Sequence, residues 1–435
     1  MNFALFVLLN AVLLIRPEEL FPAIAGARLY LILITACTIF SLPRLIELLS
    51  WDSLQRRPVA VCVLLFFAST IVSLTACGRV EEALLEFGPE FAKVVLYYFL
   101  LLATVDTEEK FQLFAASLVL AIAGLTAVAL AQHYEYVEFA NIIPCIQKDI
   151  DPVTGDQIQF PRLVSSGIFN DPNDLCLILG LGIQCCIYLV TASAWPLMFR
   201  LLWLLPIPVF GFAILETHSR GGLMGVLAGG AAYLFSRFGG PRALPLAAAA
   251  ALGGLLLVGG RQASISGDTA HERLMMWADG LTNLLNTPFS IPTGLGIGWF
   301  VDETAHVAHN SFIQAYVELG VFGGGAFLGM FILSLLLLYR LGGSIRAPAW
   351  VVESRHFAFA VVAGYAMGCY SITRNFVVPT YIVIGIGSVL LDQVADRLPE
   401  QHTVTWAWLK RCIFLAILGL VAMKVATQVL GQAGV

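Results

Sequence analysis

Residues 311–339 read SFIQAYVELGVFGGGAFLGMFILSLLLLY and contain a single charged side chain, Glu318. About 20 mostly apolar residues in a helix cross the hydrocarbon core of a bilayer, so this stretch is long enough to span a membrane. Twelve further apolar stretches fill the chain: 2–15, 23–41, 58–76, 89–105, 111–132, 173–193, 196–216, 219–236, 243–260, 356–373, 377–395 and 408–430. The sequence therefore predicts an all-α polytopic membrane protein with 12 or 13 transmembrane helices, the lower number applying if 2–15 is too short to cross.

The composition agrees with this class. The chain has 435 residues, of which 59% are hydrophobic and 12% are charged, whereas about 25% of the residues in a soluble domain are charged. A net charge of −5 without a basic tail argues against a nucleic-acid partner. The nine cysteines show no metal-type spacing. Because the apolar stretches make up most of the chain, we expect a single membrane domain, 1–435, surrounded by membrane lipids.

Lysines and arginines in the short loops orient the chain. With the N-terminus in the cytoplasm, a small majority of the 24 basic residues lie in or beside cytoplasmic loops. The two long loops, 133–172 and 261–310, then lie outside the cytoplasm. We expect them to share that compartment with the short turns at Arg220 and Arg374.

Arginines in the outward-facing segments are the first candidates for a binding site, because an arginine kept beside an apolar span is costly. They come from separate segments, at Arg162, Arg220, Arg261 and Arg374. A guanidinium group forms bidentate hydrogen bonds with phosphate oxygens and stays charged. A pyrophosphate at the membrane surface is therefore a matching ligand. A histidine in the same pocket could accept a proton from an attacking hydroxyl. Arginines could then replace a divalent cation at the leaving diphosphate.

Four motifs lie between residues 160 and 340. They are HSRGG at 218–222, Arg273 followed by Trp277, PTGLGIGW at 292–299, and HNSFIQAYVELGVFG at 309–323. In this order, and with many spans around them, they resemble the O-antigen ligase and polymerase superfamily. The resemblance implies a C-type, all-helical glycosyltransferase fold in the bacterial inner membrane.

The resemblance also implies a reaction. Members transfer a glycan, without metal or cofactor and with inversion, from undecaprenyl pyrophosphate to a lipid or saccharide acceptor on the periplasmic face. It implies that Arg220 and Arg273 bind the pyrophosphate and that His309 is the catalytic base. The segment that contains Arg162 and FNDPND at 169–174 is similar to a segment found in many members. The compact second loop departs from the family pattern at the part that would bind the acceptor.

Each candidate also has a purely structural interpretation. Arg220 could extend from a helix end to the interface, and Arg273 could form a surface ion pair with Glu272 or Asp279. Arg261 ends an apolar stretch and could mark the interface. Asn310 is a further substrate-binding candidate, but with Ser311 it also fits the N-cap of the next helix.

The remaining histidine and carboxylate candidates have alternatives as well. His306 and His309 would share one face if they lay in a helix, and could then bind a metal. Asp171 and Asp174 form a helix-start signature with Pro172, in which either Asn170 or Asp171 is expected to cap the helix. Glu318, about two turns into a span, is expected to pair with a basic or polar neighbour.

Three reactions share the predicted chemistry: ligation of O-antigen to lipopolysaccharide core, polymerisation of repeat units, and glycosylation of a protein. A rival interpretation from another class is a transporter or flippase for an anionic lipid or solute, since outward arginines would bind such a ligand too. Transporters often contain inverted repeats and broken helices at the membrane midplane. The sequence contains no such repeat, so we favour the transferase.

Overall fold

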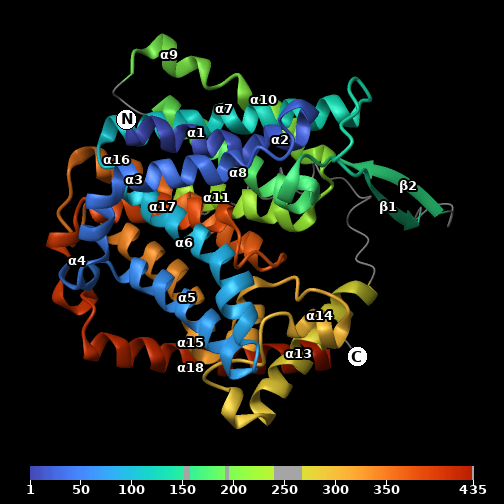
Figure 1. The fold of residues 1–435 in the computed structure, drawn as a ribbon, viewed down its shortest axis with the longest axis vertical. Helices are drawn as coiled ribbons and strands as arrows, with labels where there is room; N and C mark the ends of the chain where they lie inside the picture. Colours follow the sequence, from blue (N-terminus) through green and yellow to red (C-terminus); the bar gives the residue numbers. More distant parts are fainter. Residues whose placement is uncertain (151–156, 192–194, 240–266, 434–435) are drawn as a thin grey trace. The chain divides into compact units, whose positions relative to one another are not determined.

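A computed structural model describes residues 1–150, 157–191, 195–239 and 267–433 (Figure 1). The predicted span 243–260 and the candidate Arg261 lie outside the described residues. Within them, eight helices are long and apolar enough to cross a membrane, and Val378–Asp392 is a shorter apolar helix. The predicted all-α polytopic membrane class agrees with this result, although the predicted number of spans is higher.

Most helices begin and end within a few residues of the predicted stretches. The long ones are α1 (Asn2–Ile15), α3 (Leu29–Leu49), α5 (Pro58–Ala76), α6 (Phe87–Thr104), α7 (Glu108–His133), α8 (Pro172–Thr191), α10 (Pro206–Glu216), α11 (Arg220–Phe238), α13 (Gly267–Asn286), α15 (Ser311–Arg340), α16 (Ala349–Cys369), α17 (Val378–Asp392) and α18 (Trp406–Ala433). The short ones are α2 (Pro17–Leu20), α4 (Trp51–Gln55), α9 (Leu197–Leu202) and α14 (Trp299–Thr304). Among the predicted spans, α1 has only 14 residues, and α11 and α16 fall below the apolar content of the eight.

Two helices depart from their predicted bounds. The stretch predicted at 23–41 forms a helix only from Leu29, because Gly26 and Arg28 have positive φ values of 82° and 48°. This helix then continues through Pro43 to Leu49. The helix predicted at 356–373 begins earlier, at Ala349, and ends at Cys369. A prediction from apolar content alone therefore misplaces the end of a helix where backbone geometry or polar residues within the helix determine that end.

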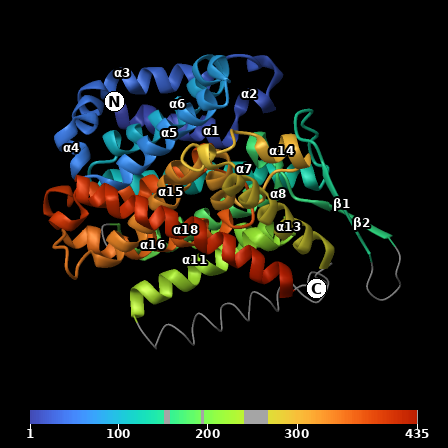
Figure 2. The ribbon, with the colours of Figure 1, turned by 90° about the horizontal axis from the view of Figure 1, so that it is seen from below.

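The first long loop contains a β-hairpin that the sequence analysis did not predict. Strands β1 (Cys145–Ile150) and β2 (Gln157–Arg162) pair antiparallel, with Cys145 opposite Arg162. The hairpin extends beyond the ends of α7 and α8 in both ribbon views (Figures 1 and 2). Its base packs through Ile142 and Val164 against Leu20. The sheet therefore places Arg162 at the base of the hairpin, next to the residues that pack against Leu20.

The chain forms two compact units that alternate along the sequence. Unit 1 comprises Met1–Leu45, Leu100–Ser264 and Pro348–Gly368, and unit 2 comprises Ile46–Phe99, Ile265–Ala347 and Cys369–Val435. In unit 1, α8 packs against α7, α10 and α11, and α1 packs against α7. In unit 2, α15 packs against α5, α13, α17 and α18. Figure 2 shows α13, α15 and α18 close together.

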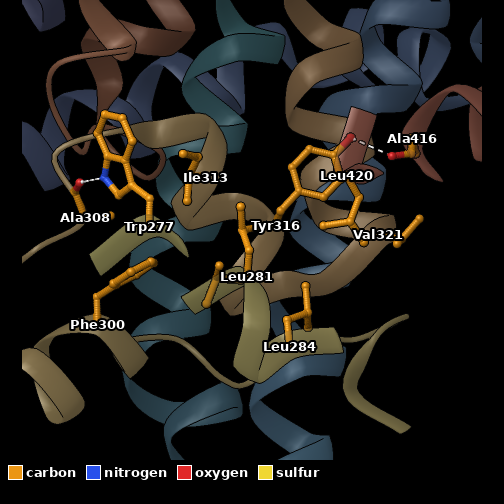
Figure 3. Packing of buried hydrophobic residues seen from close by; sticks show 11 residues of the cluster. Trp277, Leu281, Leu284, Phe300, Ala308, Ile313, Tyr316, Val321, Ala416 and Leu420 are labelled. Atoms are coloured by element: carbon orange, nitrogen blue, oxygen red, sulfur yellow. Dashed lines mark hydrogen bonds between the residues drawn. The ribbon is translucent and has the colours of Figure 1, made fainter. Parts of the chain in front are cut away.

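The buried core of unit 2 joins the second long loop to the spans. Trp277 and Leu281 of α13, Phe300 of α14, Tyr316 of α15 and Leu420 of α18 are in one cluster (Figure 3). The hydroxyl of Tyr316 donates a hydrogen bond of 3.0 Å to the carbonyl of Ala416. The amphipathic helix α13 is thus packed into the core of this unit by its apolar face.

Helix α15 breaks at Gly320, and the glycine run of the second loop completes the break. Gly320 has φ 68° and ψ −165°, a conformation that is essentially restricted to glycine. The amides of Leu295 and Gly296 donate hydrogen bonds of 2.9 and 3.1 Å to the carbonyls of Val317 and Glu318. The amide of Val321 donates to the carbonyl of Ile291 across 2.8 Å. The loop therefore supplies partners for backbone groups that an unbroken helix would satisfy internally.

Candidate functional site

The predicted site residues fall into two groups, one in each unit. Arg162 and Arg220 belong to unit 1, whereas Arg273, His309 and Asn310 belong to unit 2. We call the first group, with Asn173 and Ser219, the arginine cluster. We call the second group, with Arg374, the histidine cluster. That all these residues share one ligand stays a prediction.

The arginine cluster is assembled where β2 ends and where α8 and α11 begin. Nε of Arg162 donates a hydrogen bond of 2.8 Å to the carbonyl of Thr217, and Nη2 lies 3.4 Å from Oδ1 of Asn173. The same Oδ1 accepts a hydrogen bond of 2.6 Å from the hydroxyl of Ser219. Asn173 therefore connects Arg162 to the residue immediately before Arg220. No binding role was predicted for Asn173 from the sequence.

Local caps explain why the chain turns at these positions. The side chain of Asp171 accepts a 2.8 Å hydrogen bond from the amide of Asn173, which confirms the helix-start signature. The hydroxyl of Ser219 caps α11 by accepting a 3.0 Å hydrogen bond from the amide of Gly222. Arg220 is exposed at the first position of this helix. Both arginines are thus held near helix N-termini, which favour anions.

Electrostatics in this cluster favour an unprotonated histidine beside cationic arginine. Burial lowers the pKa of His218, Arg162 and His133 lower it further, and Glu216 opposes the change. Burial also lowers the pKa of the Arg162 guanidinium, against the effects of Cys145 and Asp171. The ring of His218 meets Phe160 edge-on at 4.8 Å. Arginine remains charged in proteins, so the net charge of the arginine cluster depends on nearby carboxylates such as Glu216 and Asp171.

The histidine cluster surrounds the first turn of α15. Asn310 caps this helix, since its Oδ1 accepts hydrogen bonds of 3.0 and 3.1 Å from the amides of Phe312 and Ile313. The structural interpretation of Asn310 is therefore confirmed, and its binding role stays a prediction. His309 has a positive φ of 50°, which is uncommon for a residue other than glycine and requires support from its surroundings.

Two distant segments supply that support. The indole Nε1 of Trp277 donates a 2.6 Å hydrogen bond to the carbonyl of Ala308, the residue before His309 (Figure 3). On the other side, the hydroxyl of Ser311 donates to the carbonyl of Ile372 across 2.7 Å and accepts from the amide of Arg374 across 2.9 Å. The turn that carries Arg374 is therefore fixed to the head of α15.

Arg273 lies one helical turn before Trp277 on α13. Its side chain is half-buried, and burial lowers the pKa of its guanidinium. Among the side chains that the structure describes it forms no ion pair or hydrogen bond, so the alternative of a surface pair with Glu272 or Asp279 is not present. A half-buried cation without a partner among the described residues is an unusual arrangement, because desolvated charges are normally paired. Arg273 is thus suited to bind an external anion.

The structure also bears on two other interpretations of the sequence, one for His306 and His309 and one for Glu318. His306 and His309 lie in the loop before Ser311 and not in a helix, so the alternative in which they share a metal-binding helix face does not apply. The described ranges contain no group of three or more His, Cys, Asp or Glu side chains arranged to hold a metal. Glu318 is buried, and its Oε2 accepts a 3.0 Å hydrogen bond from Nε2 of Gln314, which confirms the expected polar neighbour.

Comparisons with known proteins add no family assignment to this geometry. No family model matches the chain, and no curated protein matches it.

Proposed function

We propose that this protein is an inner-membrane glycosyltransferase that moves a glycan from a polyprenyl pyrophosphate to an acceptor hydroxyl on the periplasmic face. The observation that carries the proposal is the histidine cluster. It combines a histidine held by neighbouring segments with a half-buried arginine that lacks an ion-pair partner among the described residues. A base and an anion-binding group are the pair that displacement of a diphosphate requires. The Trp277–Ala308 hydrogen bond joins the segments that carry them.

In this mechanism His309 accepts the proton of the acceptor hydroxyl. The hydroxyl oxygen bonds to the anomeric carbon while the bond from that carbon to the phosphate oxygen breaks. Its electron pair leaves with the polyprenyl pyrophosphate, and attack from the opposite face inverts the configuration. Arg273 and Arg374 stabilise the charge on the leaving diphosphate. Arg220 is assigned to pyrophosphate binding by the family resemblance.

An apolar groove in unit 2 supports a lipid-linked donor. It has a volume of about 660 Å³ and is lined by α5, α15 and α18, including Leu65, Leu319, Gly325, Leu333 and Ala416. Beyond the break at Gly320, the residues of α15 that line it extend from Val321 to Leu333, a helix length of about 18 Å at 1.5 Å per residue. That length is more than half of the hydrocarbon core. Exposed apolar side chains on α18, such as Phe414 and Leu418, agree with contact to lipid.

The test is glycan transfer by the purified full-length protein in detergent, with a synthetic polyprenyl-pyrophosphate glycan and candidate acceptors in the presence of EDTA. We expect turnover by the unmodified protein and a loss of at least 100-fold in His309→Gln. His306→Gln is the matched control, because this histidine is exposed three residues earlier in the same loop. Undiminished transfer by His309→Gln would overturn the assignment of the base. Binding of the lipid without any turnover would favour the transporter.

A further inference from the structure

A second cavity lies in unit 1, between the C-terminal end of α7 and the base of the β-hairpin. Its volume is about 530 Å³, within the range of sites for small ligands. Its polar lining consists of Gln132, His133, Glu135, Glu138 and Arg162. Only Arg162 among them was a site candidate from the sequence.

The walls of this cavity are held in place by the protein itself. The chain turns sharply after α7, with Glu135 at φ 60° and the amide of Tyr136 donating to the carbonyl of Ala131 across 2.9 Å. The side-chain oxygen of Gln132 accepts a 2.7 Å hydrogen bond from the amide of Phe139. The opposite wall is the hairpin base, where Ile146 and Pro161 are paired across the two strands. The cavity is therefore formed before any ligand binds.

The cavity presents both hydrogen-bond donors and acceptors. Arg162 is oriented by Thr217 and Asn173, and no carboxylate of the described residues lies within ion-pair distance of it. Glu135 and Glu138 are exposed at the rim, and their side chains form no hydrogen bond or ion pair in the described ranges. Nε2 of His133 lies 3.4 Å from Oε2 of Glu216. Glu216 does not line the cavity.

This combination selects one class of ligand. Two carboxylates at the rim repel a phosphate, and the half-buried guanidinium repels a cation. A sugar hydroxyl both donates and accepts hydrogen bonds, so it can bind a carboxylate and a guanidinium or amide at once. The apolar side chains of Ile146 and Pro161 provide a surface for the C–H face of a sugar ring.

We infer that this cavity binds a neutral saccharide. The inference rests on the proposed function in taking the saccharide to be part of the transferred or accepting glycan. It adds a place where the sugar portion is recognised, separate from the residues assigned to the chemistry. Glu135, Glu138 and Arg162 are its specificity-determining residues.

The test is binding and does not require turnover. Fluorescently labelled full-length protein in detergent is applied to an array of neutral and acidic oligosaccharides, and positive sugars are titrated in solution. We expect binding to at least one neutral oligosaccharide, weakened 10-fold or more in the double variant Glu135→Gln, Glu138→Gln and in Arg162→Ala. Glu109→Gln is the matched control, an exposed carboxylate at the opposite end of α7. Its affinity is expected to be unchanged.

Two results would overturn the inference: no neutral sugar binds the unmodified protein, or the double variant binds as well as the control. Displacement of the sugar by inorganic pyrophosphate in the Glu109→Gln protein would also contradict it, because the cavity would then be an anion site. His309→Gln separates the two proposals, since it should bind the sugar normally while losing transfer. Sugar binding that depends on the rim carboxylates, in a protein that never transfers a glycan, would sustain this inference and reject the transferase.

Discussion

The indole nitrogen of Trp277 and the carbonyl oxygen of Ala308 are 2.6 Å apart, so helix α13 holds the residue that precedes His309. Both residues are buried in the core of unit 2. The left-handed backbone of His309 is thereby supported on one side by α13 and on the other by the turn bound to Ser311. The position of the proposed base depends on contacts outside its own helix.

Replacing Trp277 by phenylalanine should keep most of the packing and remove this hydrogen bond. We expect a loss of about 1 kcal/mol in the free energy of unfolding, and a lower kcat with little change in KM, because Trp277 positions the base and does not touch the substrate. Steady-state kinetics and thermal unfolding check both. Trp299→Phe is the control, since Trp299 packs against the same cluster without a hydrogen bond of its indole in the described ranges. Equal kinetics of the two variants would contradict the positioning role.

Replacing Arg273 by alanine should separate function from stability. Because the half-buried guanidinium forms no bond within the described chain, its removal should leave the midpoint of thermal unfolding unchanged or raise it. Transfer should fall by about 100-fold or more, as for loss of a group that stabilises developing charge.

Arg79 provides the comparison for Arg273. Its guanidinium binds both carboxylate oxygens of Glu82 at 2.7 and 2.8 Å and the carbonyl of Ile297 at 2.5 Å. We expect Arg79→Ala to lower the free energy of unfolding by about 1 kcal/mol or more. If Arg273→Ala proved the less stable of the two, Arg273 would be a structural residue.

The break in α15 makes a prediction about stability. At Gly320 a Cβ atom would lie 2.5 Å from the amide nitrogen of Gly294, in a backbone conformation that disfavours any other residue. We expect Gly320→Ala to lower the free energy of unfolding by about 3 kcal/mol. In the control Gly211→Ala, a Cβ on α10 would meet nothing within 4 Å, and stability should be unchanged or higher. Thermal unfolding in detergent measures both, and similar midpoints would show that the break is not needed.

Stability should also depend on the protonation of His402, which follows α17. Nη1 of Arg340 lies 2.5 Å from Nε2 of His402, so this nitrogen accepts a hydrogen bond only when the ring is neutral. Burial lowers the pKa of His402, and the charges of Arg340 and Arg411 lower it further. The folded pKa is therefore below the unfolded value of about 6.5. The stabilisation that neutral His402 gives to the folded protein is complete above about pH 6.5. It is lost as the pH falls through the folded pKa of His402.

His402→Gln tests this expectation, because glutamine can accept the hydrogen bond and does not titrate. The unfolding midpoint should fall more between pH 8 and pH 5.5 in the unmodified protein than in this variant. Other groups that titrate in this range, such as His218, are shared by both proteins and cancel in the comparison. Parallel pH profiles would remove His402 as the source.

The sequence predicted features that depend on local composition. The bounds of α1 and α5 coincide with the predicted stretches, and Pro58 begins α5 as expected for a first helical position. The caps at Asp171 and Asn310 were also predicted, since a helix start requires a side-chain acceptor a few residues away in sequence. Both features depend only on residues near one another in the chain. The hydrophobicity of a segment determines whether it enters an apolar environment, and the residues at its start determine whether the helix is capped.

Other features required the tertiary structure. The sequence singled out the glycine run at 292–299 only as a motif, and its role in completing the break at Gly320 depends on contacts between segments about 25 residues apart. The sequence left open an ion pair of Arg273 with Glu272 or Asp279, which the described side chains do not form. The link from Arg162 through Asn173 to Ser219 was not predicted. Hydrophobicity and capping determine where each helix lies in the sequence. Which polar side chains meet is decided only by packing, because many alternative pairings are compatible with the same local pattern.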